Sequence, residues 1–347
     1  MSYQVKIQSS GHRFTVEEQE SVLDAALRQG VILPYGCRNG ACGSCMGTVI
    51  EGQVSYDGGL PPALTEADAA QNRALFCQAR AGSDLAIEVR EVDAARDIVV
   101  KTLPCRVDKL EHLAHDVIRI YLKLPSTERL QFLAGQYIDV LIKNHEPRAF
   151  SIANAPHDDA FVELQIRYVE GGLFTDEVFH HMQEKTLLRI RGPLGTFFLR
   201  EDTDRPVILI GGGTGFAPLK GILEHAFETG IERPMHLFRG VRAQRDLYLD
   251  ELPAHWAQEH TNFSYTPVLS EPATDDDWNG NTGLVTDSVI ANHPDLSGYD
   301  VYMSGPPVMV EAGYTLFQQH GLDTSRFFSD AFEYAAVAES IKGLSQD

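Results

Sequence analysis

Four of the five cysteines have the spacing of a metal-binding loop. Cys37, Cys42 and Cys45 form a C-x4-C-x2-C pattern, and Cys77 follows at a distance. This is the plant-type [2Fe–2S] spacing, in which one tight loop and a distant fourth thiolate together give each of two irons two ligands. A zinc site built from the same cysteines is the alternative. Zinc sites usually contain two separated C-x2-C pairs, so the asymmetric spacing favours iron–sulfur.

The glycines of this loop and the fifth cysteine fit that interpretation. Gly36, Gly40 and Gly43 allow the backbone to fold around a cluster and to direct its N–H groups at the sulfurs. Cys105 lies in an apparent strand and is expected to be a small buried hydrophobic residue. An odd number of cysteines, without a visible secretory signal, argues against a disulfide framework.

A second group of chemically useful residues follows a strand near the middle of the chain. Arg148 offers a positive charge for a diphosphate, Phe150 an aromatic ring to lie against a planar group, and Ser151 a hydroxyl to hydrogen-bond it. Arginine and aromatic residues occur in many strands, so this pattern gains weight only from its neighbours in the chain.

A glycine turn at Gly171 and Gly172 comes just before an expected helix start that contains Thr175. The exposed N–H groups at a helix N-terminus suit a phosphate. The alternative is an ordinary helix cap in which Thr175 is the capping residue. The segment therefore predicts either a phosphate-binding turn or a plain cap.

A third motif joins a strand, a glycine-rich turn and a helix. The strand 207–210 runs into the segment 211–215, which contains Gly212, Thr214 and Gly215, and a helix is expected over 219–228. This order places a pyrophosphate on a helix N-terminus. The second strand ends without the usual acidic residue, at Arg239, so the segment is not the common dinucleotide fingerprint.

These motifs are positioned by three predicted domains. Residues 1–96 combine short strands with one helix over 20–27, and a polar linker is expected over 97–102. Residues 103–201 contain short β-runs separated by turns, which is typical of an antiparallel barrel. In residues 202–347 strands alternate with helices, which predicts a parallel sheet.

Composition limits the remaining possibilities. The 347 residues are 43% hydrophobic and 22% charged, as in ordinary globular proteins, and the net charge is −20. So acidic a chain disfavours nucleic-acid binding, which needs clustered lysine and arginine. No apolar run approaches the length of a membrane span. We therefore expect a cytoplasmic protein with no nucleic-acid or membrane partner.

In the order cysteine loop, R-x-F-S segment and glycine loop, these motifs resemble the ferredoxin–NADP reductase superfamily, in the branch with an N-terminal plant-type ferredoxin domain. Members include reductase components of aromatic-ring oxygenases, of soluble methane and phenol monooxygenases, and of CDP-6-deoxyhexose deoxygenation. The resemblance covers nearly the whole chain. It implies a multidomain protein with an α+β β-grasp ferredoxin domain, an antiparallel Greek-key β-barrel flavin domain and an α/β parallel-sheet nucleotide domain.

The resemblance also implies roles for single residues in holding the cluster and FAD. The cluster would be ligated by Cys37, Cys42, Cys45 and Cys77. Arg148 would meet the flavin diphosphate, Phe150, where the family usually has tyrosine, would pack on the isoalloxazine, and Ser151 would face flavin N5. The phosphate region of FAD would be held by Gly171, Gly172 and Thr175.

The nicotinamide cofactor would be held by the nucleotide domain, where Gly212, Thr214 and Gly215 would line its site. Ser304 replaces the cysteine of the family's C-G-x-x segment near the nicotinamide, which leaves the contribution of this side chain to hydride transfer open. Phe332, in the C-terminal region near the flavin, is a further candidate.

The function implied is that of an NAD(P)H-dependent iron–sulfur flavoprotein oxidoreductase. Electrons would pass from the nicotinamide through FAD to the [2Fe–2S] cluster and on to a partner oxygenase, of the Rieske type that attacks aromatic rings or of a related multicomponent type. The alternative acceptor is a CDP-6-deoxyhexose dehydrase of deoxysugar biosynthesis. A rival of another class is a zinc-bearing binding module fused to a redox-inactive fold.

We expect the protein to prefer NADH over NADPH because of Glu271. NADPH-using relatives commonly have Ser-Arg where this chain has Ser270 and Glu271. A carboxylate would repel a 2′-phosphate and could accept a hydrogen bond from a ribose hydroxyl. Against this, one of Arg239, Arg242 and Arg245 could neutralise the phosphate, which keeps NADPH open.

Overall fold

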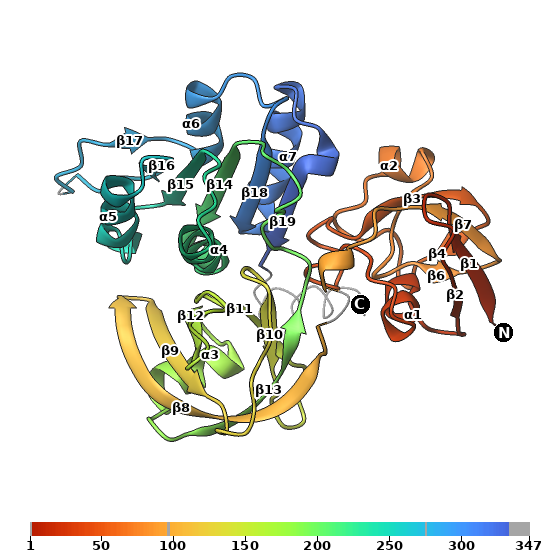
Figure 1. Cartoon of the computed structure of the whole chain (residues 1–347), viewed down its shortest axis with the longest axis horizontal. Coiled ribbons are helices and arrows are strands. Elements are labelled where there is room, and N and C mark those ends of the chain that lie inside the picture. Colours follow the sequence, from red (N-terminus) through yellow and green to blue (C-terminus); the bar gives the residue numbers. More distant parts are fainter. Residues whose placement is uncertain (1, 96–97, 275, 333–347) are drawn as a thin grey trace. The chain divides into compact units, whose positions relative to one another are not determined.

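The computed structural model describes residues 2–95, 98–274 and 276–332, so the last part of the predicted nucleotide domain, residues 333–347, lies outside the described residues. The chain divides into two units, one with the residues up to Ile98 together with Gly195–Phe197 and Ser329–Ala331, and one with the rest. Three main sheets form, in the predicted order (Figure 1). In the described ranges, no helix has both the length and the apolar character needed to cross a membrane.

The N-terminal sheet has the order β2-β1-β7-β3-β5, with β1 and β7 parallel and the other pairs antiparallel. Its strands are β1 Tyr3–Ile7, β2 Arg13–Val16, β3 Met46–Glu51, β5 Arg73–Leu75 and β7 Leu85–Glu88. The smaller elements are α1 Val22–Arg28, α2 Glu66–Ala70, the pair β4 Val54–Ser55 and β6 Arg80–Ala81, and η1 Asp93–Ala95. A helix packed on a mixed sheet confirms the β-grasp prediction.

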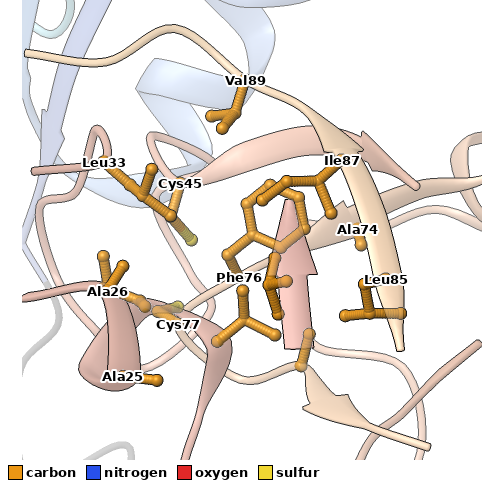
Figure 2. Close-up of a cluster of buried hydrophobic side chains, with 14 of the residues drawn as sticks. Ala25, Ala26, Leu33, Cys45, Ala74, Phe76, Cys77, Leu85, Ile87 and Val89 are labelled. Carbon is orange, nitrogen blue, oxygen red and sulfur yellow. The ribbon is translucent and has the colours of Figure 1, made fainter. Parts of the chain in front are cut away.

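Helix α1 is placed by a cap and by its buried face. The Ser21 hydroxyl accepts from the backbone N–H of Asp24, so the helix begins at Val22 rather than at residue 20. Leu23 and Ala26, on the apolar face of α1, are fully buried in the core that also contains Phe76. Figure 2 shows Ala26 and Phe76 in this core. Cys45 and Cys77 belong to the same core, so the cluster loop is attached to packed structure.

The middle sheet is antiparallel, with the order β11-β10-β13-β8-β9-β12. Its strands are β8 Lys101–Ala114, β9 Val117–Lys123, β10 Tyr137–Val140, β11 Arg148–Ser151, β12 Val162–Arg167 and β13 Leu187–Leu194. Figure 1 shows the sheet strongly curved, with helix α3, Leu173–His180, beside it. Because β13 lies between β8 and β10, the connections are of the predicted Greek-key kind.

The C-terminal sheet has the order β17-β16-β15-β14-β18-β19, and β14 to β18 pair in parallel. Its strands are β14 Val207–Gly212, β15 Met235–Val241, β16 Phe263–Leu269, β17 Asn281–Thr282, β18 Asp300–Gly305 and β19 Phe327–Ala331. The helices are α4 Phe216–Glu228, α5 Glu251–Glu259, α6 Val285–Asn292 and α7 Pro307–Gln319, with short turns η2 Gly213–Gly215, η3 Gln244–Asp246 and η4 Thr324–Arg326. Figure 1 shows α4 and α5 on one face of the sheet and α6 and α7 on the other.

Helix α4 starts three residues earlier than predicted. The sequence favours a start after Pro218, whereas the helix begins at Phe216. Proline is tolerated there because the N–H groups of the first turn have no partner within the helix. The consequence is that the helix N-terminus lies directly against the glycine-rich turn.

Candidate functional site

The four cysteines of the predicted cluster form two pairs. The backbone N–H of Cys37 lies 3.4 Å from Cys42 Sγ, and that of Cys42 lies 3.3 Å from Cys37 Sγ. A hydrogen bond from the Cys37 thiol lowers the pKa of Cys42. In the other pair, a hydrogen bond to Cys77 and burial raise the pKa of Cys45. Two pairs of thiols match two irons with two ligands each.

The separation of these pairs speaks against zinc. Around one tetrahedral zinc, with Zn–S bonds of about 2.3 Å, the sulfurs lie about 3.8 Å apart. A single metal ion needs at least three ligand atoms close together. Among the described residues, one group of His, Cys, Asp or Glu side chains has three such atoms within 4.8 Å of one another, and it consists of His115, Asp116 and Asp246. No three of the four sulfurs therefore meet at the distance that a single metal ion requires, and the donor set fits a two-iron cluster.

The cluster loop needs glycine at Gly40. Its φ is +85°, and a Cβ there would lie 2.7 Å from Cβ of Pro61. A side chain would thus be strained by conformation and blocked by space. Beside it, Asn39 is exposed and Arg38 is half-buried in an ion pair with Asp24 of α1.

Strand β11, Arg148–Ser151, carries the R-x-F-S residues; we call it the flavin strand. The Arg148 guanidinium donates to the carbonyls of Glu146 and Pro147, which holds it at the strand start. Phe150 packs against Phe174 of α3, with ring centroids 5.3 Å apart. Ser151 is buried. The contact between the two rings brings the flavin strand and the start of α3 together.

The structure shows that Thr175 is not the capping residue of α3, so that alternative prediction is wrong. The N-cap residue is Gly172, and no side chain caps the helix. Thr175 lies within the first turn, and its hydroxyl donates to the carbonyls of Val169 and Gly172. Thr175 therefore shapes the turn, with Gly171 at a φ of +72°. The first N–H groups of the helix are left for another acceptor, such as a phosphate.

The glycine-rich segment 211–215, which we call the nucleotide loop, lies where the strand order reverses. β15 to β17 follow on one side of β14, and β18 lies on its other side. In open α/β sheets, ligands bind outside the carboxyl ends of the strands at such a point. A Cβ on Gly212 would lie 2.7 Å from Met309 Sδ, and a Cβ on Gly215 would overlap the carbonyl oxygen of Ser304. Glycine at position 215 lets the loop lie directly on β18, and glycine at position 212 leaves room for Met309 of α7.

Ser304 carries the feature that best fits a bound group. It is fully buried and pairs with Gly211 across β14 and β18, and its Oγ has no hydrogen-bond partner among the described residues. Buried polar atoms are almost always paired, so a partner from outside the protein is expected. The neighbouring Gly305 carbonyl accepts from the backbone N–H of Phe332, which places Phe332 at the same edge.

The residues expected to select between NADH and NADPH differ in how far they are exposed to solvent. Glu271 is exposed just after β16, and its N–H donates to the Arg242 carbonyl. Arg242 and Arg245 are exposed. Arg239 is fully buried, with its guanidinium 4.0 Å from the Phe216 ring. Arg239 is therefore not available for a solvent-facing 2′-phosphate, which corrects that part of the prediction.

Each of the three sheets overlaps a segment of the chain that matches a known protein family. A 2Fe-2S iron-sulfur cluster binding domain matches residues 5–82, an oxidoreductase FAD-binding domain matches 104–199, and an oxidoreductase NAD-binding domain matches 209–314. The chain belongs to the ferredoxin–NADP reductase superfamily, in the branch with its own plant-type ferredoxin domain. It is an NAD(P)H-dependent oxidoreductase whose cofactors are a [2Fe–2S] cluster and FAD.

Relatives of this reductase cover nearly its whole length. The CDP-6-deoxy-L-threo-D-glycero-4-hexulose-3-dehydrase reductase of Yersinia pestis is 40% identical over 96% of this chain and 99% of its own. The phenol hydroxylase P5 protein of Acinetobacter pittii is 37% identical over 98% of both chains. The crystal structure of an Amycolatopsis cytochrome P450 reductase is 34% identical over 96% of this chain and 99% of its own, with a TM-score of 0.77.

The sequence motifs missed Lys220 and Glu163. Both are buried, and they form an ion pair between α4 and β12. The available signal was Lys220 itself, a charged residue between apolar neighbours in the predicted helix. No local pattern marks Glu163, because its partner is distant in the chain.

Proposed function

We propose that this reductase delivers electrons to the oxygenase component of a multicomponent oxygenase. The observation that carries the proposal is the cluster domain on the same chain as the flavin and nucleotide domains, in the arrangement shared with a phenol hydroxylase protein and a P450 reductase. Flavin, when bound, accepts two electrons as a hydride and releases them singly, which suits a one-electron cluster. A [2Fe–2S] cluster held by the four cysteines would supply one-electron transfer to a protein acceptor.

In this proposal the residues bind and orient the cofactors. Cys37, Cys42, Cys45 and Cys77 ligate the two irons, in the pairs described above. Around FAD, Arg148 holds the diphosphate, Phe150 packs on the ring, and Ser151 donates to it; Gly171, Gly172 and Thr175 form the phosphate turn.

The nucleotide loop, with Gly212, Thr214 and Gly215, would hold the nicotinamide cofactor. The hydroxyl of Ser304, which has no hydrogen-bond partner among the described residues, would hydrogen-bond the nicotinamide, and Phe332 would contact the flavin. Glu271 accepts from a ribose hydroxyl, which makes NADH the preferred donor. Each of these roles needs the residue only to bind or to orient a group.

Reconstitution tests the acceptor. The purified protein, NADH and the oxygenase component encoded nearest to it would be mixed, and product formation would be measured against NADH consumed. Coupled hydroxylation that depends on the reductase supports the proposal. Normal ferricyanide reduction without any transfer to that oxygenase would exclude it as the acceptor.

A second candidate is a CDP-6-deoxyhexose dehydrase. The specific observation in its favour is the 40% identity to a reductase of that system, slightly above the 37% to the phenol hydroxylase protein. The same assay with the dehydrase in place of the oxygenase distinguishes the two. Reduction of the dehydrase at a higher kcat/KM than the oxygenase would favour the deoxysugar function.

A further inference from the structure

Helix α4 lies in direct contact with the flavin domain through Gly221. A Cβ at this position would lie 2.9 Å from the carbonyl oxygen of Asn154 and 3.3 Å from that of Ile152. Residues 152–154 come immediately after the flavin strand, and α4 begins immediately after the nucleotide loop. The contact therefore joins the two cofactor-binding segments through less than two turns of helix.

The neighbouring residue, Lys220, contacts the same part of the flavin domain through its buried ammonium group. Its Nζ lies 3.1 Å from the Ala153 carbonyl oxygen, 3.1 Å from Glu163 Oε2 and 2.8 Å from Glu224 Oε1. The side chains of Lys220 and Glu163 are each only 6% exposed. All three ammonium donors are thus directed at acceptors, two of which belong to the flavin domain.

The hydrogen bonds continue from Glu163 back to the nucleotide domain. Gln165 Nε2 donates to Glu163 Oε1 at 3.0 Å, and Tyr248 Oη donates to Gln165 Oε1 at 2.8 Å. Arg239 Nη1 then donates to the Tyr248 carbonyl at 2.7 Å, and its guanidinium covers the ring of Phe216, the first residue of α4. The network therefore leaves α4 at Lys220 and returns to it at Phe216.

We propose that Lys220 is a positioning residue for hydride transfer, which holds the nucleotide loop at one separation from the flavin strand through Glu163 and Ala153. This inference rests on the proposed roles of those two segments in binding the cofactors. Buried ion pairs add little net stability but can enforce one arrangement. A displacement of about 1 Å between reacting groups costs about 100-fold in rate, so an arrangement of this kind affects rate more than binding.

The test compares Lys220→Met with the double variant Lys220→Met/Glu163→Gln. The single variant leaves Glu163 buried without its ammonium. The double variant removes that charge and keeps an oxygen for Gln165, so it retains folding if the single variant loses it. Lys101→Met is the matched control, because Lys101 pairs with Glu128 at an exposed site in the same unit.

Two readouts are used on the holoenzyme. The first is anaerobic stopped-flow reduction of the flavin by NADH, which separates the limiting rate from the dissociation constant of NADH. The second is urea unfolding followed by tryptophan and by flavin fluorescence. Both tryptophans, Trp256 and Trp278, lie in the nucleotide domain, so the two signals report the two domains separately.

We expect the limiting rate to fall about 10- to 100-fold in both variants, with less than about a threefold change in the dissociation constant. We expect the tryptophan and flavin transitions to coincide in the native protein and to separate in both variants. A native limiting rate in the double variant, or coincident transitions in both variants, would overturn the assignment. Flavin reduction does not involve the acceptor, so failure of the oxygenase assay alone would count against the proposed function and not against Lys220.

Discussion

Arg233 and Asp300 form an ion pair with almost no contact with solvent: Nη2 lies 2.7 Å from Oδ2, and the side chains are 7% and 0% exposed. Asp300 begins β18, the strand that carries Ser304. Asp300→Asn should destabilise the nucleotide domain by about 3–5 kcal/mol, because Arg233 is left as an unpaired buried charge. Urea unfolding by tryptophan fluorescence measures this. Glu259→Gln, in an exposed pair with His255 of the same domain, should change stability by less than about 1 kcal/mol. Equal effects of the two variants would contradict the prediction.

Cys42→Ser should remove the activity of the cluster and leave that of the flavin. The hydroxyl is a poor iron ligand, so the cluster absorbance should fall, while the flavin and nucleotide domains keep their own cores. NADH-dependent reduction of ferricyanide should continue, and reduction of cytochrome c should fall by about tenfold or more. Cys105→Ser is the control, because Cys105 is buried in β8 and away from the cluster loop in sequence. Full cytochrome c reduction by the cluster-free protein would exclude the proposed electron order.

Arg38→Gln should affect the protein acceptor more than the dye. Arg38 is half-buried next to the ligand Cys37 and pairs with Asp24. A charge beside the point where electrons leave influences the association rate and its salt dependence. We expect a lower kcat/KM for the acceptor and a flatter salt dependence, with ferricyanide reduction unchanged. Arg28→Gln, in an exposed pair with Glu20, serves as control. A parallel loss with both acceptors would indicate a folding defect instead.

Glu271→Arg should weaken the preference for NADH. Glu271 is exposed at the carboxyl end of β16, where a carboxylate repels a 2′-phosphate and a guanidinium attracts it. The ratio of kcat/KM for NADPH to that for NADH should rise by about tenfold, equivalent to about 1.4 kcal/mol. Glu259→Arg places the same charge change near the amino end of β16 and should leave the ratio as it is. A native preference for NADPH would show that the assignment of Glu271 is wrong.

His236 should make the nucleotide domain sensitive to acid. Burial, and then the neighbouring His293, lowers the pKa of His236 to about 4. The folded state therefore resists a proton that the unfolded chain accepts below about pH 6.5. Stability should fall as the pH decreases from about 6.5 to about 4, by about 2 kcal/mol once solvent screening of this partly buried group is allowed for.

The measurement for His236 is the urea midpoint between pH 7 and pH 4. His236→Gln should show a smaller decrease over this range than the native protein, since the group that resists protonation is gone. His255→Gln, at an exposed position on α5, should follow the native curve. Identical slopes in all three proteins would mean that His236 makes no contribution.

Local sequence patterns were sufficient for the cluster and for the order of the domains. The spacing of Cys37, Cys42 and Cys45 acts within one loop, and Cys77 follows a strand that packs beside it. Strand and helix signals depend on neighbouring residues, so the barrel and the parallel sheet were predicted, whereas the start of α4 was misplaced because Pro218 is compatible with a first helical turn.

Burial and long-range pairing were decided by the tertiary structure. Arg239 looks from the sequence like a loop charge, but it is covered by Phe216 and donates to the Tyr248 carbonyl. Lys220 meets Glu163 across 57 residues of chain. Which charge is exposed and which is paired depends on contacts between elements that are distant in the chain. Residue spacing therefore determined the cofactors of this reductase, and packing determined which charged side chains face solvent and which hold its two cofactor-binding segments together.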